Sequence, residues 1–123
     1  MTYANFSDQG SITQDNLLAG EYPRASVLAT ITDGNFTRGT VLGKVTADGT
    51  YTQALSASTD GSKTPCAILA ESVDASTDDK QAVIYLTGEF NSSALIIGTG
   101  LTLATITDDL RSNSIFIKTN QPY

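Results

Sequence analysis

Three carboxylates come nearest to a catalytic set in this sequence. Glu71, Asp74 and Glu89 lie around two short apolar runs, residues 66–70 and 82–86. Two carboxylates held at a suitable separation can act as acid and base, as in glycoside hydrolysis. The stretch offers no aromatic platform for a sugar, however. We therefore interpret the acids as solvated side chains that discourage pairing between sheet edges.

Two other patterns resemble ligand-binding loops only in part. Residues 74–79 (DASTDD) place oxygen-bearing side chains as at the start of a calcium loop, but glycine is missing at the sixth position and the twelfth is Tyr85. Gly98 and Gly100 lack the third glycine and the Lys-Ser/Thr pair of a phosphate loop. We expect a turn between two strands at residues 74–79, and neither a metal nor a cofactor.

The chain has no histidine and a single cysteine. These counts exclude Ser–His–Asp and Cys–His catalysis, and zinc sites built from histidine or several thiolates. Cys66 has no basic or helix-N-terminal neighbourhood that would activate it, so we interpret it as a small buried hydrophobe. The sequence thus predicts no catalytic residue and no enzymatic activity.

The charge balance argues against a nucleic-acid partner. Thirteen acids and seven bases give a net charge of −6, and the bases are scattered singly rather than clustered. The first 20 residues lack the pattern of a signal peptide, and no apolar stretch approaches the roughly 20 residues of a membrane span. We expect a soluble product, made in a cytoplasm, with no nucleic-acid and no membrane partner.

Residues 82–86 are the run around which the other elements are expected to pack. Their number suits a strand, and apolar side chains occupy both alternating faces. Such a strand is typically covered on both sides, so we expect it to be central, next to a second strand at residues 66–70. Val27, Ala29 and Ile31 predict one apolar face for a strand within residues 21–32.

Turn signals divide the remaining sequence into short strands. Residues 33–35 (DGN) predict a turn, and residues 47–49 (ADG) predict a hairpin between a strand at residues 41–46 and Tyr51. Residues 53–63 predict a surface loop.

Towards the C-terminus a short helix is expected between two strands. Residues 101–106 are β-prone, and Thr107 with the two following acids predicts a helix N-terminus. Residues 112–114 (SNS) end that helix, and residues 115–118 form a closing strand. The sum is a mainly β, single compact domain of short strands with one or two short helices.

The first 20 residues are polar, with isolated apolar side chains that fit neither helix nor strand. Two interpretations stay open: a frayed tail, or an extended N-terminal arm that orders on a partner with Tyr3 and Phe6 as anchors. We divide the chain into an arm at residues 1–20 and a β-rich domain at residues 21–123.

Two runs in the middle of the chain form a distinctive pattern. Residues 65–75 (PCAILAESVDA) are followed by residues 82–91 (AVIYLTGEFN), and both runs resemble those of the lambda-like phage head decoration proteins. The positions that carry the resemblance are Pro65, Ala67, Leu69, Glu71, Asp74, Gly88, Glu89 and Phe90. Weaker matches at residues 41–51, 58–63 and 110–118 occur in the same order, so the resemblance covers about residues 40–118.

This resemblance implies a protein without catalysis, cofactor or metal that trimerises on the outer surface of an expanded phage capsid. There it would hold neighbouring major capsid subunits together against the pressure of packaged DNA. The N-terminal arm would contact the shell, and the arm residues we single out are Thr2, Tyr3, Phe6 and Ile12.

Two other function classes are left open by the residues alone. A β-module that binds glycans on a virion or cell surface is one, although the chain has no tryptophan. An enzyme that uses Glu71 and Glu89 is the other.

Overall fold

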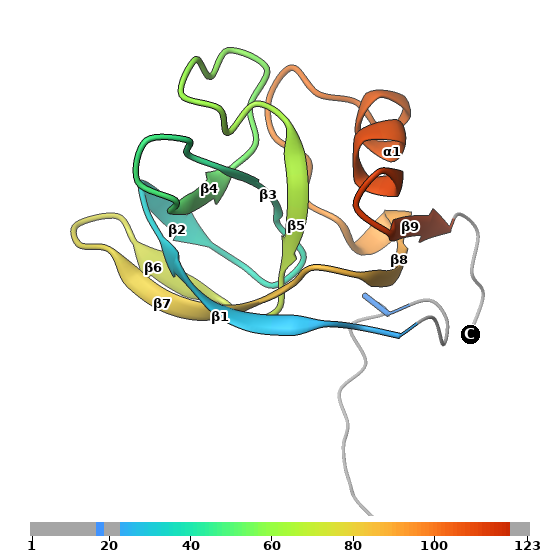
Figure 1. Cartoon of the computed structure of the whole chain (residues 1–123), viewed down its shortest axis with the longest axis horizontal. Coiled ribbons are helices and arrows are strands. Elements are labelled where there is room, and N and C mark those ends of the chain that lie inside the picture. Colours follow the sequence, from blue (N-terminus) through green and yellow to red (C-terminus); the bar gives the residue numbers. More distant parts are fainter. Residues whose placement is uncertain (1–16, 19–22, 119–123) are drawn as a thin grey trace, which may run out of the picture.

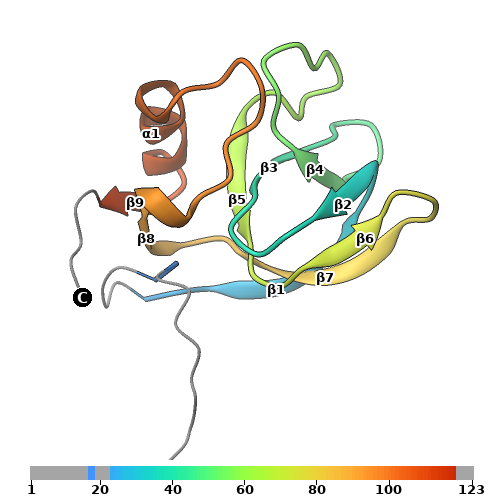
Figure 2. The same cartoon turned by 180° about the vertical axis from the view of Figure 1, so that it is seen from behind.

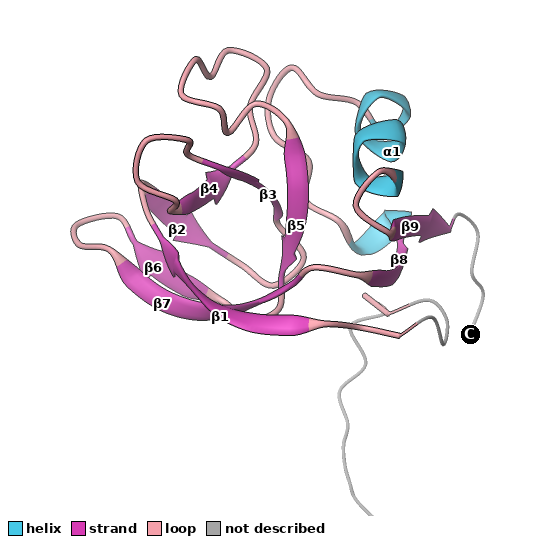
Figure 3. Cartoon of the chain, in the orientation of Figure 1, coloured by secondary structure: helices cyan, strands magenta, loops and turns pink. Residues whose placement is uncertain are grey.

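The computed structural model describes residues 17–18 and 23–118 (Figure 1). This part of the chain is mainly β, a single domain with one α-helix and one 3-10 turn (Figure 3). The strands are β1 Ser26–Ile31, β2 Gly34–Phe36, β3 Val41–Lys44, β4 Tyr51–Gln53, β5 Pro65–Leu69, β6 Val73–Ala75, β7 Lys80–Tyr85, β8 Gly88–Asn91 and β9 Ile115–Lys118; the turn η1 spans Ser92–Ala94 and the helix α1 spans Leu103–Arg111.

Five strands close into a small barrel in the order β1-β4-β3-β5-β7. Strands β2 and β6 pair as a separate antiparallel ribbon, and β8 and β9 pair in parallel. Figures 1 and 2 show that β8, β9 and α1 lie together at one side of the barrel, while β2 and β6 lie toward the other.

Strand β7 is central, as its sequence predicts. It pairs antiparallel with β1 along its whole length and with β5 at its C-terminal end. Ala82 and Ile84 are buried, whereas Val83 and Tyr85 on the other face are half-buried. The expectation of full cover on both sides is therefore met on one face only; on the second, Tyr85 packs against Phe90 of β8 but remains half-buried.

The predicted hairpin is present between β3 and β4. Leu42 faces Gln53 in its register, and the connecting turn passes through Gly49 with a φ of +75°, which glycine adopts at little cost. Gly43 in β3 is needed for another reason. A Cβ on Gly43 would stand 1.9 Å from the carbonyl oxygen of Ser62, so the loop that precedes β5 can approach β3 only over a glycine.

The turn signal at residues 33–35 is displaced. Asp33 makes the bend with a φ of +67°, but Gly34 and Asn35 already belong to strand β2, which pairs with β6. The ribbon partner Ala75 is distant in sequence, so local turn chemistry could not reveal it.

The helix begins earlier than the sequence predicts. Residues 103–106, expected as strand, form the first turns of α1, and Thr107 lies inside the helix rather than at its cap. The N-cap is Thr102, whose Oγ1 accepts a hydrogen bond from the backbone N–H of Thr105. In return, Thr105 Oγ1 accepts a hydrogen bond from the backbone N–H of Thr102 at 3.0 Å. This reciprocal pair is a capping box with threonine in place of the usual Glu or Gln. The sequence therefore lacks the usual capping-box motif at this helix start.

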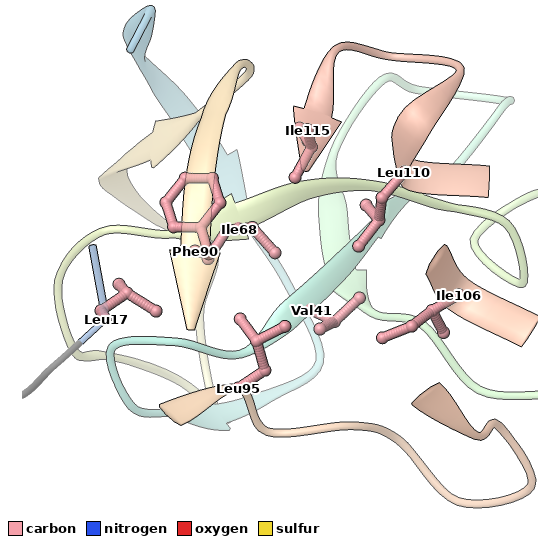
Figure 4. Packing of buried hydrophobic residues seen from close by; sticks show 8 residues of the cluster. All are labelled: Leu17, Val41, Ile68, Phe90, Leu95, Ile106, Leu110 and Ile115. Carbon is pink, nitrogen blue, oxygen red and sulfur yellow. The ribbon is translucent and has the colours of Figure 1, made fainter. Parts of the chain in front are cut away.

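Two apolar cores support these layers. One fills the barrel and includes Ile31, Leu42, Leu69 and Ile84. The other lies between the barrel and α1 (Figure 4) and consists of Leu17, Val41, Ile68, Phe90, Leu95, Ile106, Leu110 and Ile115. Because β3 and β5 each alternate between the two cores, they bind the layers together.

Replacement of the N-cap tests where the helix begins. Thr102→Ala removes the side-chain acceptor for the Thr105 N–H and should lower the free energy of unfolding by about 1 kcal/mol. Thr107→Ala is the matched control, because Thr107 lies within the helix, where its hydroxyl donates only to the Leu103 carbonyl. Urea unfolding of both variants provides the measurement. A larger loss for Thr107→Ala than for Thr102→Ala would contradict this helix start.

Candidate functional site

The N-terminal segment is attached to the domain at Leu17 and Leu18. Leu17 is 1% exposed and lies in the core beside Phe90. Its carbonyl accepts the N–H of Asn91 at 2.8 Å, and Leu18 forms an antiparallel bridge with Phe90. Leu17 and Leu18, which the sequence assigns to the arm, are thus fixed against β8 (Figure 4).

The motif residues of β5 are structural. Pro65 is buried at the beginning of the strand, where it faces Gly43 of β3. Ala67 and Leu69 are fully buried in the barrel core. Their small and branched side chains fill the interior, and none carries a polar group that could act on a ligand.

The carboxylates of Glu71 and Asp74 accept hydrogen bonds from backbone N–H groups near strand ends. Glu71 is exposed, and its carboxylate accepts the N–H of Val83 at 2.8 Å, which continues the β5–β7 ladder beyond the last residue of β5. Asp74 accepts from both the N–H and the hydroxyl of Ser76, at 3.1 and 2.5 Å. These hydrogen bonds, first from the Ser76 hydroxyl and then from its N–H, lower the pKa of the Asp74 carboxyl.

Gly88, Glu89 and Phe90 form the other half of the motif. Gly88 has a φ of +144°, and a Cβ there would stand 2.9 Å from Cγ of Arg24 and 3.0 Å from Cζ of Phe90. Glu89 forms an ion pair with Lys118 of β9 at 3.5 Å. The buried Phe90 ring packs against the ring of Tyr85, with centroids 5.4 Å apart.

The acids Glu71, Asp74 and Glu89 are not gathered into a catalytic pair. Glu71 is engaged with β7, Asp74 with its own turn and Glu89 with β9. Within residues 17–18 and 23–118, no group of three or more acidic, cysteine or histidine side chains could hold a metal ion. The expected turn between two strands is confirmed: residues 74–75 end β6, and the bend at residues 76–79 leads to β7.

Cys66 is half-buried in β5 rather than fully buried. Burial raises the pKa of its thiol, and the nearby Lys44 only partly opposes that shift. A raised pKa keeps the thiol protonated at neutral pH, so Cys66 is a poor nucleophile.

Sequence reasoning missed the role of Arg38. Its guanidinium Nη1 donates to the Ala70 carbonyl at 2.7 Å and to Tyr85 Oη at 3.4 Å, and it lies 5.9 Å from the centroid of the Tyr85 ring. The contact joins the loop after β2 to β5 and β7. An isolated arginine carries no signal of such a contact in the sequence, because its partners are a carbonyl and a ring more than 30 residues away.

The predicted shell-binding residues Thr2, Tyr3, Phe6 and Ile12 lie outside the described residues, so their role stays a prediction. No helix of the described part is long and apolar enough to cross a membrane.

A family model described as bacteriophage lambda head decoration protein D matches residues 8–115. The match covers most of the chain and includes both runs on which the resemblance was based. A search of curated proteins gave no significant match.

The aspartate–serine turns predict a dependence of stability on pH. Hydrogen bonds from Ser62 to Asp60, and from Ser76 to Asp74, lower the pKa of both carboxyl groups below their ordinary 3.8. A lowered pKa in the folded state stabilises the fold above the unfolded-state pKa, and this contribution is lost as pH falls through the folded-state value. The thermal midpoint should therefore fall as pH decreases from about 5 to below the folded-state pKa values.

Ser62→Ala and Ser76→Ala remove the donor hydroxyls and should make that decline shallower. Ser93→Ala, at an exposed serine of η1, is the control and should leave the slope unchanged. Parallel slopes for all three variants would contradict the assigned cause.

The attachment of the N-terminal segment can be tested at Leu17. Leu17→Ala should lower the free energy of unfolding by about 2–5 kcal/mol, because it leaves a cavity beside Phe90. Leu18→Ala is the control: Leu18 is half-buried and should cost clearly less. A loss for Leu17→Ala below about 1 kcal/mol in denaturant unfolding would show that Leu17 is not part of the core.

Proposed function

Because the chain belongs to the family of bacteriophage lambda head decoration protein D, we propose that it binds the outer surface of the expanded phage head as a trimer and stabilises the head against the pressure of packaged DNA. Its partner is the major capsid protein, and it is located on the outside of the virion. The observation that carries the proposal is the family match over residues 8–115.

The architecture suits a protein that acts by binding alone. The acids of the motif complete strand ends and loops, and the apolar residues of the motif fill the two cores. What the motif maintains is therefore a rigid body of fixed shape. A rigid body loses little conformational entropy when it docks, so more of the contact free energy is available for association.

The stabilising effect on the head follows from linkage. A protein that binds the expanded shell, but not the unexpanded one, shifts the equilibrium toward the expanded form by mass action. Three chains joined in a trimer bind neighbouring capsid subunits with high effective concentration, so no single contact needs to be tight.

The N-terminal segment supplies the contact that reaches beyond the rigid domain. Leu17 is held on β8, and the residues before it include the predicted contact residues Thr2, Tyr3, Phe6 and Ile12. Aromatic anchors of this kind commonly carry a large share of the binding free energy at protein interfaces.

Co-sedimentation with undecorated shells tests the proposal. The purified protein should bind expanded shells saturably and leave unexpanded shells bare. Equal binding to both forms would remove the linkage mechanism, and binding to neither would refute the decoration function for the shells tested.

A deletion of residues 1–16 tests the contribution of the N-terminal segment. The deletion stops before the buried Leu17, so the domain should unfold at a similar denaturant concentration while shell binding is lost. Tyr3→Ala and Phe6→Ala in the full chain should each weaken binding about 30-fold, the equivalent of about 2 kcal/mol. Gln9→Ala and Gln14→Ala are the matched polar controls. Full shell occupancy by the deleted protein would contradict the shell-binding role of the segment.

A further inference from the structure

Strand β1 has one paired edge and one that is largely open. On one side every residue of Ser26–Ile31 faces a partner in β7. On the other side the register includes a single pair, Ile31 with Tyr51 of β4. Within the part of the chain that the structure describes, no other strand pairs with that side, so most of this edge of β1 is open.

Backbone groups of Ser26 and Leu28 lie on the open edge. The Leu86 N–H donates to the Ala25 carbonyl, at a register position where the two strands exchange hydrogen bonds. Alternate residues of an antiparallel ladder face the same neighbour, so Val27 directs its N–H and C=O groups to β7. Ser26 and Leu28 direct theirs away from β7, where an added strand could bond to them.

Apolar side chains flank the open edge on both faces of β1. Leu28 is 62% exposed on the outer face, opposite the half-buried Val83 of β7. Val27 is 42% exposed on the inner face, opposite the buried Ile84. A strand added at this edge would cover both exposed side chains and must therefore carry apolar side chains on both of its own faces.

The open edge lacks the features that prevent strand addition in natural proteins. Residues 25–30 include no charged residue and no proline, and the β1–β7 register has no bulge. An edge of this kind is suited to β-augmentation, in which main-chain hydrogen bonds to an extended segment supply affinity and the side chains supply specificity.

The open edge begins beside the place where the N-terminal segment joins the domain. Thr87 Oγ1 donates to the Pro23 carbonyl and accepts the Ala25 N–H, which holds the beginning of β1 next to β8. Leu18 forms its bridge with Phe90, three residues further along the chain than Thr87. Figures 1 and 2 show these two segments side by side. A partner that contacts one of them can therefore reach the other.

We propose that an extended segment of the major capsid protein, uncharged and apolar on both faces, adds as a strand to the open edge of β1 when the protein docks on the expanded shell. This inference rests on the proposed function. The location favours this occupant, because a shell that binds the N-terminal segment faces the side of the domain where the edge begins. A second copy that paired through the same edge would form a two-fold dimer, which does not fit a three-fold trimer.

Co-sedimentation with undecorated expanded shells tests the apolar part of this contact. Leu28→Lys places a charge against the apolar side chains of the added strand and should raise the dissociation constant at least about tenfold. Ile96→Lys is the matched control. Ile96 is 40% exposed, but its N–H and C=O are already bonded to Gly39 and Val41, so this variant should bind as the unaltered chain does. Both substitutions are at exposed positions, and both variants should unfold at the denaturant concentration of the unaltered chain.

Hydrogen exchange at single amides tests the strand addition itself. On expanded shells, the Ser26 and Leu28 amides should exchange at least about tenfold more slowly than in the free protein. The Val27 and Ala29 amides face β7 and are internal controls, which should exchange alike in both states. Shell-bound protein in which Ser26 and Leu28 exchange as they do in the free protein would overturn the proposal.

A photoreactive benzoylphenylalanine in place of Leu28 identifies the partner. Irradiation on expanded shells should link the chain to the major capsid protein, and a product that joins two copies of this chain would overturn the proposal. Binding of the unaltered chain is measured in the same series. If the unaltered chain and Leu28→Lys bind equally well, the inference fails and the proposed function stands. If the unaltered chain binds no shell, both fail.

Discussion

Phe90 lies fully buried where strand β8 meets Leu17 and the ring of Tyr85, in one core with Ile115 and the inner face of α1. Its backbone pairs with Ile117 of β9 on one side and forms a bridge with Leu18 on the other. Burial of one large ring thus fixes the closing strand and the origin of the N-terminal segment together. Gly88 allows this arrangement, since a side chain there would meet the Phe90 ring. The family match, residues 8–115, includes Leu17, Phe90 and Ile115, the first residue of β9.

The barrel depends on strand β7, which leads directly into β8. Strand β7 pairs with both β1 and β5 to close the barrel, and two residues later the chain continues as β8. Ile84 therefore lies in one core and Phe90 in the other, on a single nearly continuous stretch. The two cores are coupled, because a change in the packing of either one would displace residues 84–90. Such coupling favours a domain that moves as one body.

The sequence predicted the parts of the fold that local pattern determines and missed those that distant contacts determine. The central position of residues 82–86 and the β3–β4 hairpin followed from apolar runs and from Asp-Gly turn chemistry. The start of α1 did not, because Thr105 takes the place of the acid in the capping box and Leu101 and Leu103 suit a strand equally well. For the motif, residue types identified Glu71 and Asp74 as notable acids, but only the structure shows that they complete a ladder and a turn. Arg38 and the open edge of β1 were not predictable, since their character depends on neighbours far along the chain.

The alternation of Val27, Ala29 and Ile31 illustrates how a correct pattern can hide an important surface. It predicts one apolar face for β1, and Ile31 is indeed buried. The pattern says nothing about pairing, however, and β4 reaches β1 only at Ile31. Val27 projects past the end of the core on the apolar face, and Leu28 lies on the opposite face, which the pattern treats as solvent-facing. The exposed edge results from the length of β4, a strand of three residues that is too short to cover its neighbour.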